Sequence, residues 1–173
     1  MAVWQWDVWL VPKEEITKHF QIIPQYMDLD WFESIDWWNA VSEKQMAAFF
    51  EGVLPDYFTP WAKNTRSWGS DLGDRVELTV HEGKITDMVI RIDLRNLNTD
   101  FLMSLLDLAE KKHFLFFSLE SRKFIEPTAP KLFQEINNSR KMLFIKNPDE
   151  FFEDKTRFDK ITKENLRKIN END

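Results

Sequence analysis

Apolar and polar residues alternate along several stretches of the chain, which is the pattern of a β-strand with one buried face. Residues 3–11 follow this pattern, and so do residues 75–81 and 87–95 on either side of a Glu82-Gly83 pair. The last two stretches therefore predict a β-hairpin. A two-residue loop would put their apolar rows on opposite faces, whereas an odd-length loop keeps both rows together. We accordingly predict a three-residue connection with Gly83 in a left-handed conformation.

Other stretches are marked by helix-end signals or by continuous apolar runs. Helices are predicted where a cap or a proline precedes apolar residues, and these positions are 13–20 after Pro12, the capping box at 42–45, the segment after Asn98, the segment after Pro127 and Pro130, and Asn147-Pro148. The unbroken apolar run at 114–119 is typical of a central strand, and residues 142–145 predict another short strand. Residues 22–39 show no clean period and are interpreted as a loop with one helical turn.

These elements predict one α+β domain over residues 1–155. Its sheet is expected to be mainly antiparallel, with four to six strands and with helices packed on one face. Six acidic and six basic residues fill positions 153–173 with few core formers between them. Residues 156–173 are therefore predicted to be a charged helix or a frayed tail.

Composition narrows the function classes. The 173 residues include 23 Lys and Arg against 30 Asp and Glu, which gives a net charge of −7, and there is no cysteine. A disulfide framework, a thiol nucleophile and a cysteine-based metal site are thereby excluded. The acidic balance disfavours nucleic acid and anionic membrane surfaces, and it suits a basic protein partner. The chain has no apolar run of roughly 18–20 residues and no basic signal region at its start, so we expect a cytoplasmic protein without a membrane span.

Motif searches find no catalytic set. The three histidines, His19, His81 and His113, lack the spacing that brings two ligands onto one metal. Nucleophile-elbow and phosphate-binding glycine patterns do not occur, and the acids at 28–36 do not fit a calcium loop. We expect no metal and no cofactor, and an enzyme is the less favoured interpretation.

Three charged residues share one face of a predicted strand: Arg91, Asp93 and Arg95. They could pair across the sheet with Arg75 and Glu77 and form a self-neutralising face, which is the favoured interpretation. The alternative is that they bind an anion or orient a ligand.

One segment, at 28–38, combines acids and aromatic rings without any basic residue. Its candidate partner-binding residues are Asp28, Asp30, Trp31, Glu33, Asp36, Trp37 and Trp38. Large rigid aromatics are favoured at the centre of protein interfaces, and charges at the rim set partner choice. The alternative is that the rings pack over the sheet as core. Trp37 and Trp38 are neighbours and cannot both point inward on a regular element, so we expect one of them to be partly exposed.

The N-terminal part of the chain is both its aromatic and its acidic part. All 8 tryptophans lie in the first 68 residues, where ten acidic and five basic residues give −5 of the total charge. In general character the whole chain resembles small, acidic, cysteine-free α+β proteins that bacteria use as immunity or antitoxin partners. That resemblance implies a protein that binds and occludes a toxin domain and needs no cofactor.

Three functions remain in view. The leading hypothesis is a non-enzymatic protein-binding domain, such as an immunity protein, that meets its partner through the segment at 28–38. The second is a small-molecule-binding protein, or an enzyme whose site is assembled from scattered residues, with Arg91, Asp93 or Arg95 orienting the ligand. Single-stranded nucleic acid binding by stacked aromatics has enough rings but the wrong charge.

Overall fold

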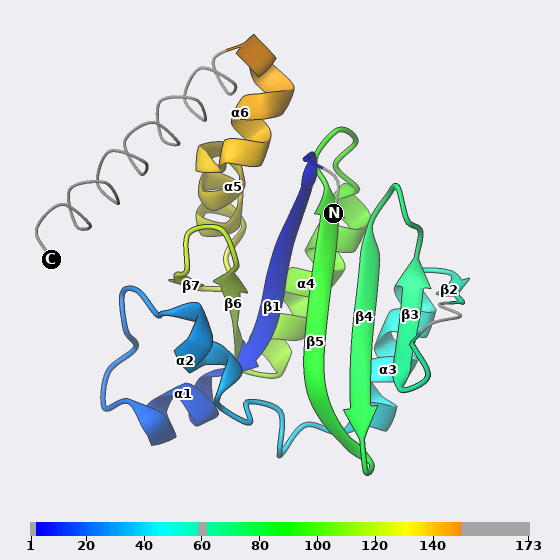
Figure 1. Ribbon diagram of the computed structural model, residues 1–173, viewed down its shortest axis with the longest axis vertical. Coiled ribbons are helices and arrows are strands. Elements are labelled where there is room, and N and C mark those ends of the chain that lie inside the picture. The colour runs from blue at the N-terminus through cyan, green and yellow to red at the C-terminus, as the bar shows by residue number, and fades with distance from the viewer. Residues whose placement is uncertain (1–2, 59–61, 150–173) are drawn as a thin grey trace, which may run out of the picture.

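The computed structural model of the protein describes residues 3–58 and 62–149, which form an α+β fold around a seven-stranded antiparallel sheet (Figure 1). The strand order is β2-β3-β4-β5-β1-β6-β7. The strands are β1 (Gln5–Pro12), β2 (Asp56–Tyr57), β3 (Thr65–Gly69), β4 (Arg75–His81), β5 (Lys84–Asp93), β6 (Phe114–Ser118) and β7 (Phe124–Ile125). The predicted fold class is confirmed. The strand number exceeds the predicted four to six because the sheet also includes β3 and the two-residue edge strands β2 and β7, which the sequence pattern did not indicate.

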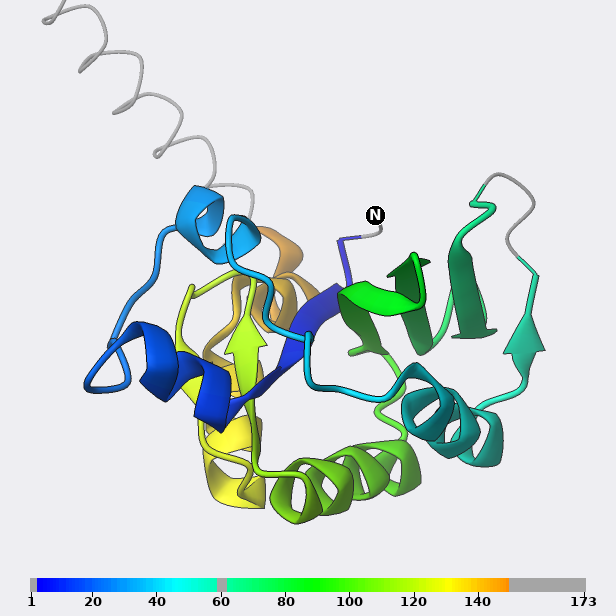
Figure 2. The same cartoon turned by 90° about the horizontal axis from the view of Figure 1, so that it is seen from below.

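Six helices surround the sheet in the described part of the chain. They are α1 (Lys13–His19), α2 (Leu29–Glu33), α3 (Glu43–Val53), α4 (Thr99–Lys111), α5 (Ala129–Asn138) and α6 (Arg140–Lys146). Figure 2 shows α3 and α4 along one face of the sheet, while α2 lies on the other side. The predicted cap at Asn98 is confirmed, since Asn98 Oδ1 accepts a hydrogen bond from Phe101 N. Of the capping box predicted at 42–45, the Ser42 half is seen: Ser42 Oγ accepts from Gln45 N, while Gln45 Oε1 accepts from Lys112.

The C-terminal region corrects one prediction. Residues 142–145, predicted as a strand, belong to α6. A run of four residues carries too little periodicity to separate strand from helix, and the local cap decides the outcome. Ser139 ends α5, and its Oγ accepts a hydrogen bond from Met142 N at 3.1 Å, which starts the next helix immediately. Pro148 is helical, as predicted, and the charged tail predicted at 156–173 lies outside the described residues.

The β4–β5 hairpin corrects a second prediction. Its loop has two residues, not three, because His81 pairs with Lys84. Glu82 and Gly83 both have positive φ, at 51° and 75°, so Gly83 is left-handed as predicted. The register then shifts between Val80 and Thr79, which leaves one extra residue on β5.

That extra residue, Thr86, forms a β-bulge and brings the two apolar rows onto one face. On the side of the bulge away from the turn, Leu78 pairs with Met88 and Val76 pairs with Ile90. All four of these side chains are fully buried. The sequence therefore predicted that both apolar rows share one face. It did not predict that a β-bulge, rather than an odd-length loop, would achieve this.

Strand β1 lies between β5 and β6 and is buried along its whole length. Its residues alternate between two environments. Trp6, Val8 and Leu10 have no exposed surface and share a face with the apolar rows of the hairpin, which α3 and α4 cover. The opposite face carries Asp7 and Trp9. Asp7 contacts the charged side chains of Arg91 and Lys141, and the Trp9 indole donates to Asp87.

Candidate functional site

The acidic segment begins with α2, whose first turn is fixed by Asp28. The Asp28 carboxylate caps the helix by accepting a hydrogen bond from Asp30 N at 3.0 Å. It also forms an ion pair with Arg122 at 3.3 Å, so this predicted partner-binding acid already has a cation beside it. Asp28 therefore has a structural role in placing α2, and it remains at the surface.

Trp37 and Trp38 are both buried, which contradicts the expectation that one of them would be partly exposed. Their exposed fractions are 1% and 4%. The Trp37 indole N–H donates to the carbonyl of Phe32, and the Trp38 indole N–H donates to the carbonyl of Leu10, both at 2.7 Å. The chain around them is a turn rather than a strand or helix, so two neighbours can point to the same side.

Trp31 has the opposite environment, with 63% of its surface exposed. Its ring lies beside that of Phe20, with the centroids 5.7 Å apart. Asp30, Glu33 and Asp36 are exposed on the same segment. We call the set Asp28, Asp30, Trp31, Glu33 and Asp36 the Trp31 surface; it contains five of the seven predicted partner-binding residues.

Beside the Trp31 surface lies a cavity of about 240 Å³, which we call the aromatic cavity. It is lined by Trp9, Phe32, Glu33, Ile35, Trp37, Trp38, Thr86 and Asp87. Phe32 of α2 organises the rings: its centroid lies 5.2 Å from both Trp9 and Trp37. It also stacks on Phe117 of β6 at 4.1 Å, which anchors α2 to this face of the sheet.

Asp87 places a partly buried carboxylate in the aromatic cavity. Its Oδ1 accepts a hydrogen bond from Trp9 Nε1 at 2.8 Å. Burial raises the pKa of Asp87, the hydrogen bond from Trp9 opposes this, and the charges of Glu77 and Glu33 raise it further. Among the described ion pairs, none includes Asp87 or Glu33.

Sequence reasoning missed Asp87 and Trp9 as site residues. A signal was present, because Trp9 and Asp87 both belong to the rows of their strands that face away from α3 and α4. On β5 the sequence predicts a self-neutralising charged face for this row, and only the pairing of β1 with β5 brings Trp9 within hydrogen-bond distance of Asp87.

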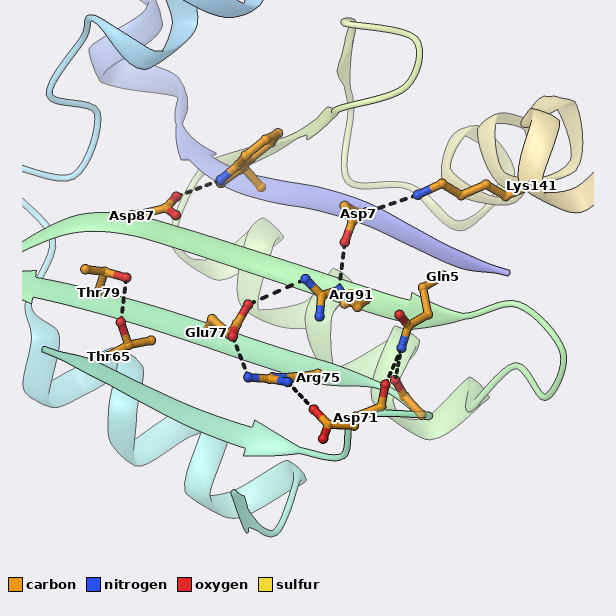
Figure 3. A network of polar contacts seen from close by, with 12 residues as sticks. Gln5, Asp7, Thr65, Asp71, Arg75, Glu77, Thr79, Asp87, Arg91 and Lys141 are labelled. Carbon is orange, nitrogen blue, oxygen red and sulfur yellow. Dashed lines mark hydrogen bonds and ion pairs between the residues drawn. The ribbon is translucent and has the colours of Figure 1, made fainter. Parts of the chain in front are cut away.

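The strand face beyond the aromatic cavity carries a network of alternating charges (Figure 3). Arg91 donates to Asp7 at 3.0 Å and lies 3.6 Å from Glu77, which in turn accepts from Arg75 at 2.6 Å. Lys141 of α6 reaches the second oxygen of Asp7 at 3.0 Å. The network supports the self-neutralising interpretation of Arg91, although it is more buried than a solvent face: Asp7 is 1% exposed.

Asp93 and Arg95 pair with each other at the far end of β5. Arg95 donates to both oxygens of Asp93, at 3.0 and 2.8 Å, and its guanidinium lies 4.3 Å from the centroid of the Trp4 ring. Burial opposes ionisation of Asp93, but the hydrogen bonds and charge of Arg95 outweigh it and lower the pKa of Asp93. The candidate ligand-orienting residues are thus paired with other side chains of the fold, and none of them lines the aromatic cavity.

A larger groove, about 470 Å³, runs between α1 and the start of α3. It contains Lys13, Lys112 and His113 together with the acids of α1. Lys13 lies 3.6 Å from Glu126, and Lys112 donates to the side chain of Gln45 at 2.7 Å. Its cations therefore have partners within the fold, and the groove has no single charge character.

Within residues 3–58 and 62–149, no group of three His, Asp or Glu side chains is placed to hold a metal ion. The helices of that same part of the chain include none with the length and apolar character needed to cross a membrane. Comparison of the chain with protein-family models, with curated proteins and with solved structures gave no match.

Proposed function

We propose that this protein is a non-enzymatic binding domain that holds a basic protein partner through the Trp31 surface, in the manner of an immunity or antitoxin protein. The observation that carries the proposal is the exposure of Trp31 among acids. An indole that is 63% exposed leaves a large apolar area in water, and covering it would favour association.

The surrounding surface supports the same conclusion. Seven large hydrophobic residues are exposed in the described part of the chain, and three of them, Ile22, Tyr26 and Trp31, lie within ten residues of sequence. Residues 21–40 contain four acids and no Lys, Arg or His. Arg122 pairs with Asp28, but none of the described ion pairs includes Asp30, Glu33 or Asp36, so the border of the apolar anchor is predominantly acidic. Such a border is suited to a basic partner, because opposite charges speed encounter and select against acidic proteins.

The experiment is affinity capture from the native host lysate with matched variants. Trp31→Ala should reduce recovery of the basic partner at least about fivefold, because truncation of an interface anchor commonly costs more than 1 kcal/mol. Met103→Ala is the control, since Met103 is an exposed apolar residue of α4, on the other side of the sheet. Equal recovery with wild type and Trp31→Ala would overturn the role of the Trp31 surface.

A further inference from the structure

The aromatic cavity has features that the proposed function does not yet use. Its volume of about 240 Å³ lies below the roughly 300–1,000 Å³ of pockets that hold drug-sized ligands. It is therefore sized for one side chain or a small amine. The rings of Trp9, Phe32, Trp37 and Trp38 line the cavity and are at most 7% exposed, so a ligand would meet a small part of each ring.

The hydrogen-bond donors of these rings are already used. The indole N–H groups of Trp9, Trp37 and Trp38 donate to Asp87, to the Phe32 carbonyl and to the Leu10 carbonyl. What the rings can offer a ligand is their π-systems, whose negative faces attract cations, with tryptophan the most effective.

The charge of the cavity points in the same direction. Two carboxylates line it, Asp87 and Glu33, and no Lys, Arg or His is among its lining residues. The strand network nearby is different, because there each acid faces a basic side chain of the fold, such as Asp7 with Arg91 and Lys141. A partly buried carboxylate without a cation is costly, and its pKa is raised accordingly.

A backbone irregularity places one of these carboxylates. Thr86, the extra residue of the β5 bulge, lines the cavity next to Asp87. The bulge sets the register in which Asp87 pairs with Thr79 and shares a face with Trp9. Bulges commonly re-aim side chains next to functional sites.

We propose that the aromatic cavity binds an organic cation, the ammonium or guanidinium group of a Lys or Arg side chain of the basic partner. The aromatic rings contact the alkyl stem and the cation, and Asp87 and Glu33 balance its charge. The proposal rests on the proposed function for the source of the cation, while the chemistry of the cavity itself is testable without a partner.

The first experiment titrates the isolated protein with n-butylammonium and n-butylguanidinium chloride at constant ionic strength. The readout is the NMR signal of the Trp9 indole N–H, which reports on its bond to Asp87. Both cations should shift this signal saturably in the millimolar range, and neutral n-pentanol should not. The Asp87→Asn/Glu33→Gln variant keeps an amide oxygen for Trp9 but removes both charges, so its affinity should fall about tenfold or more.

Asp107→Asn is the matched control, because Asp107 is an exposed acid of α4. It should titrate like wild type. Equal shifts with n-pentanol, or no saturable shift with either cation, would overturn the cation site. Equal affinity of wild type and the double variant would overturn the role of the two carboxylates.

The second experiment repeats the capture assay with the Asp87→Asn/Glu33→Gln variant. Its recovery of the basic partner should fall while that of Asp107→Asn does not. Unchanged recovery, with Trp31→Ala still defective, would overturn the cavity proposal and leave the Trp31 surface intact. Conversely, cation binding in the titration with unchanged capture by Trp31→Ala would overturn the Trp31 surface and keep the cavity as a cation site.

Discussion

Three tryptophans within eight residues of sequence differ in exposure: Trp31 is exposed, whereas Trp37 and Trp38 are buried. The local backbone accounts for the difference. Trp31 is on the outer side of α2 and is exposed, while Trp37 and Trp38 turn inward and donate to main-chain carbonyls. The sequence predicted an aromatic-acidic segment but could not assign its rings, because residues 34–41 form turns that follow no fixed period. The acids were easier to place: Asp30, Glu33 and Asp36 are exposed, as ionised carboxylates usually are.

The residue-scale prediction concerns Asp87. Burial raises the pKa of Asp87 above its value in the unfolded chain, so the folded protein binds this proton more tightly than the unfolded one. The carboxylate therefore lowers stability at neutral pH, and the loss is relieved as the pH falls through the raised pKa. Asp87→Asn removes the charge and keeps an acceptor for Trp9, so it should be more stable than wild type at neutral pH.

Urea unfolding at neutral and at acidic pH measures this effect. The advantage of Asp87→Asn should shrink in acid, where Asp87 of the wild type is protonated as well. Asp36→Asn, at an exposed position of the neighbouring turn, is the control and should change little at either pH. A variant less stable than wild type at neutral pH would contradict the prediction and would mean that the charge of Asp87 stabilises the fold.

At the scale of elements, periodicity predicted most strands and helices, and the misses have local causes. The strands β1, β4, β5 and β6 carry alternating or continuous apolar rows long enough to be recognised. The edge strands β2 and β7 have two residues each and show no pattern, since only pairing with a neighbour defines them. Strand β3 was missed too, because its five residues, TRSWG, contain one large apolar side chain and no alternation. The bulge at Thr86 could not be predicted from local sequence either, because it is defined by how β5 pairs with β4.

The element-scale prediction concerns the turn at Glu82-Gly83. Both residues have positive φ, which Asn tolerates better than Glu does, so Glu82→Asn should raise the free energy of unfolding by about 0.5–1 kcal/mol. Gly83→Ala should lower it by about 1 kcal/mol. A Cβ at Gly83 would meet no atom within 4 Å, so this loss comes from the backbone alone.

Gly52 of α3 is the matched control for the turn. A Cβ there also meets nothing within 4 Å, but its φ is helical. Gly52→Ala should therefore stabilise the protein by about 0.5–1 kcal/mol, opposite in sign to Gly83→Ala. Chemical denaturation of the three variants decides the matter, and a neutral Gly83→Ala would show that the loop is not the two-residue turn described.

At the scale of the whole molecule, the polar side chains of the sheet connect segments far apart in the sequence. Asp7 of β1 binds Arg91 of β5 and Lys141 of α6, and it is almost fully buried (Figure 3). The pairing of Arg91 with Glu77 was foreseen from strand alternation, but Asp7 and Lys141 were not. Lys141 is 134 residues from Asp7, and no local pattern relates them.

The whole-molecule prediction is a loss of stability when Asp7 loses its charge. Asp7→Asn removes the charge of the buried carboxylate that both Arg91 and Lys141 contact, which should cost about 2–4 kcal/mol of unfolding free energy. Asp107→Asn removes an exposed pair with Lys111 and should cost less than about 0.5 kcal/mol. Equilibrium urea unfolding compares the two variants.

Adding Lys141→Met to Asp7→Asn should recover part of the loss, because it removes one of the two cations that contacted the Asp7 carboxylate. If Asp7→Asn proved as harmless as Asp107→Asn, Asp7 would not hold α6 against the sheet.

By itself the sequence determined the α+β class, the hairpin, the capped helices, the acidic character of residues 28–36 and the pairing of Arg91 with Glu77, because these follow from periods, caps and charges within a few residues or across one hairpin. Only the tertiary structure decided that Trp37 and Trp38 are core, that a bulge sets the hairpin register, and that Trp9 and Asp87 meet in a cavity beside Trp31. The first depends on how the turn at 37–40 packs against β1, and the other two depend on which strands become neighbours. That choice is made by burying apolar surface over the whole chain, and no local window of sequence contains it.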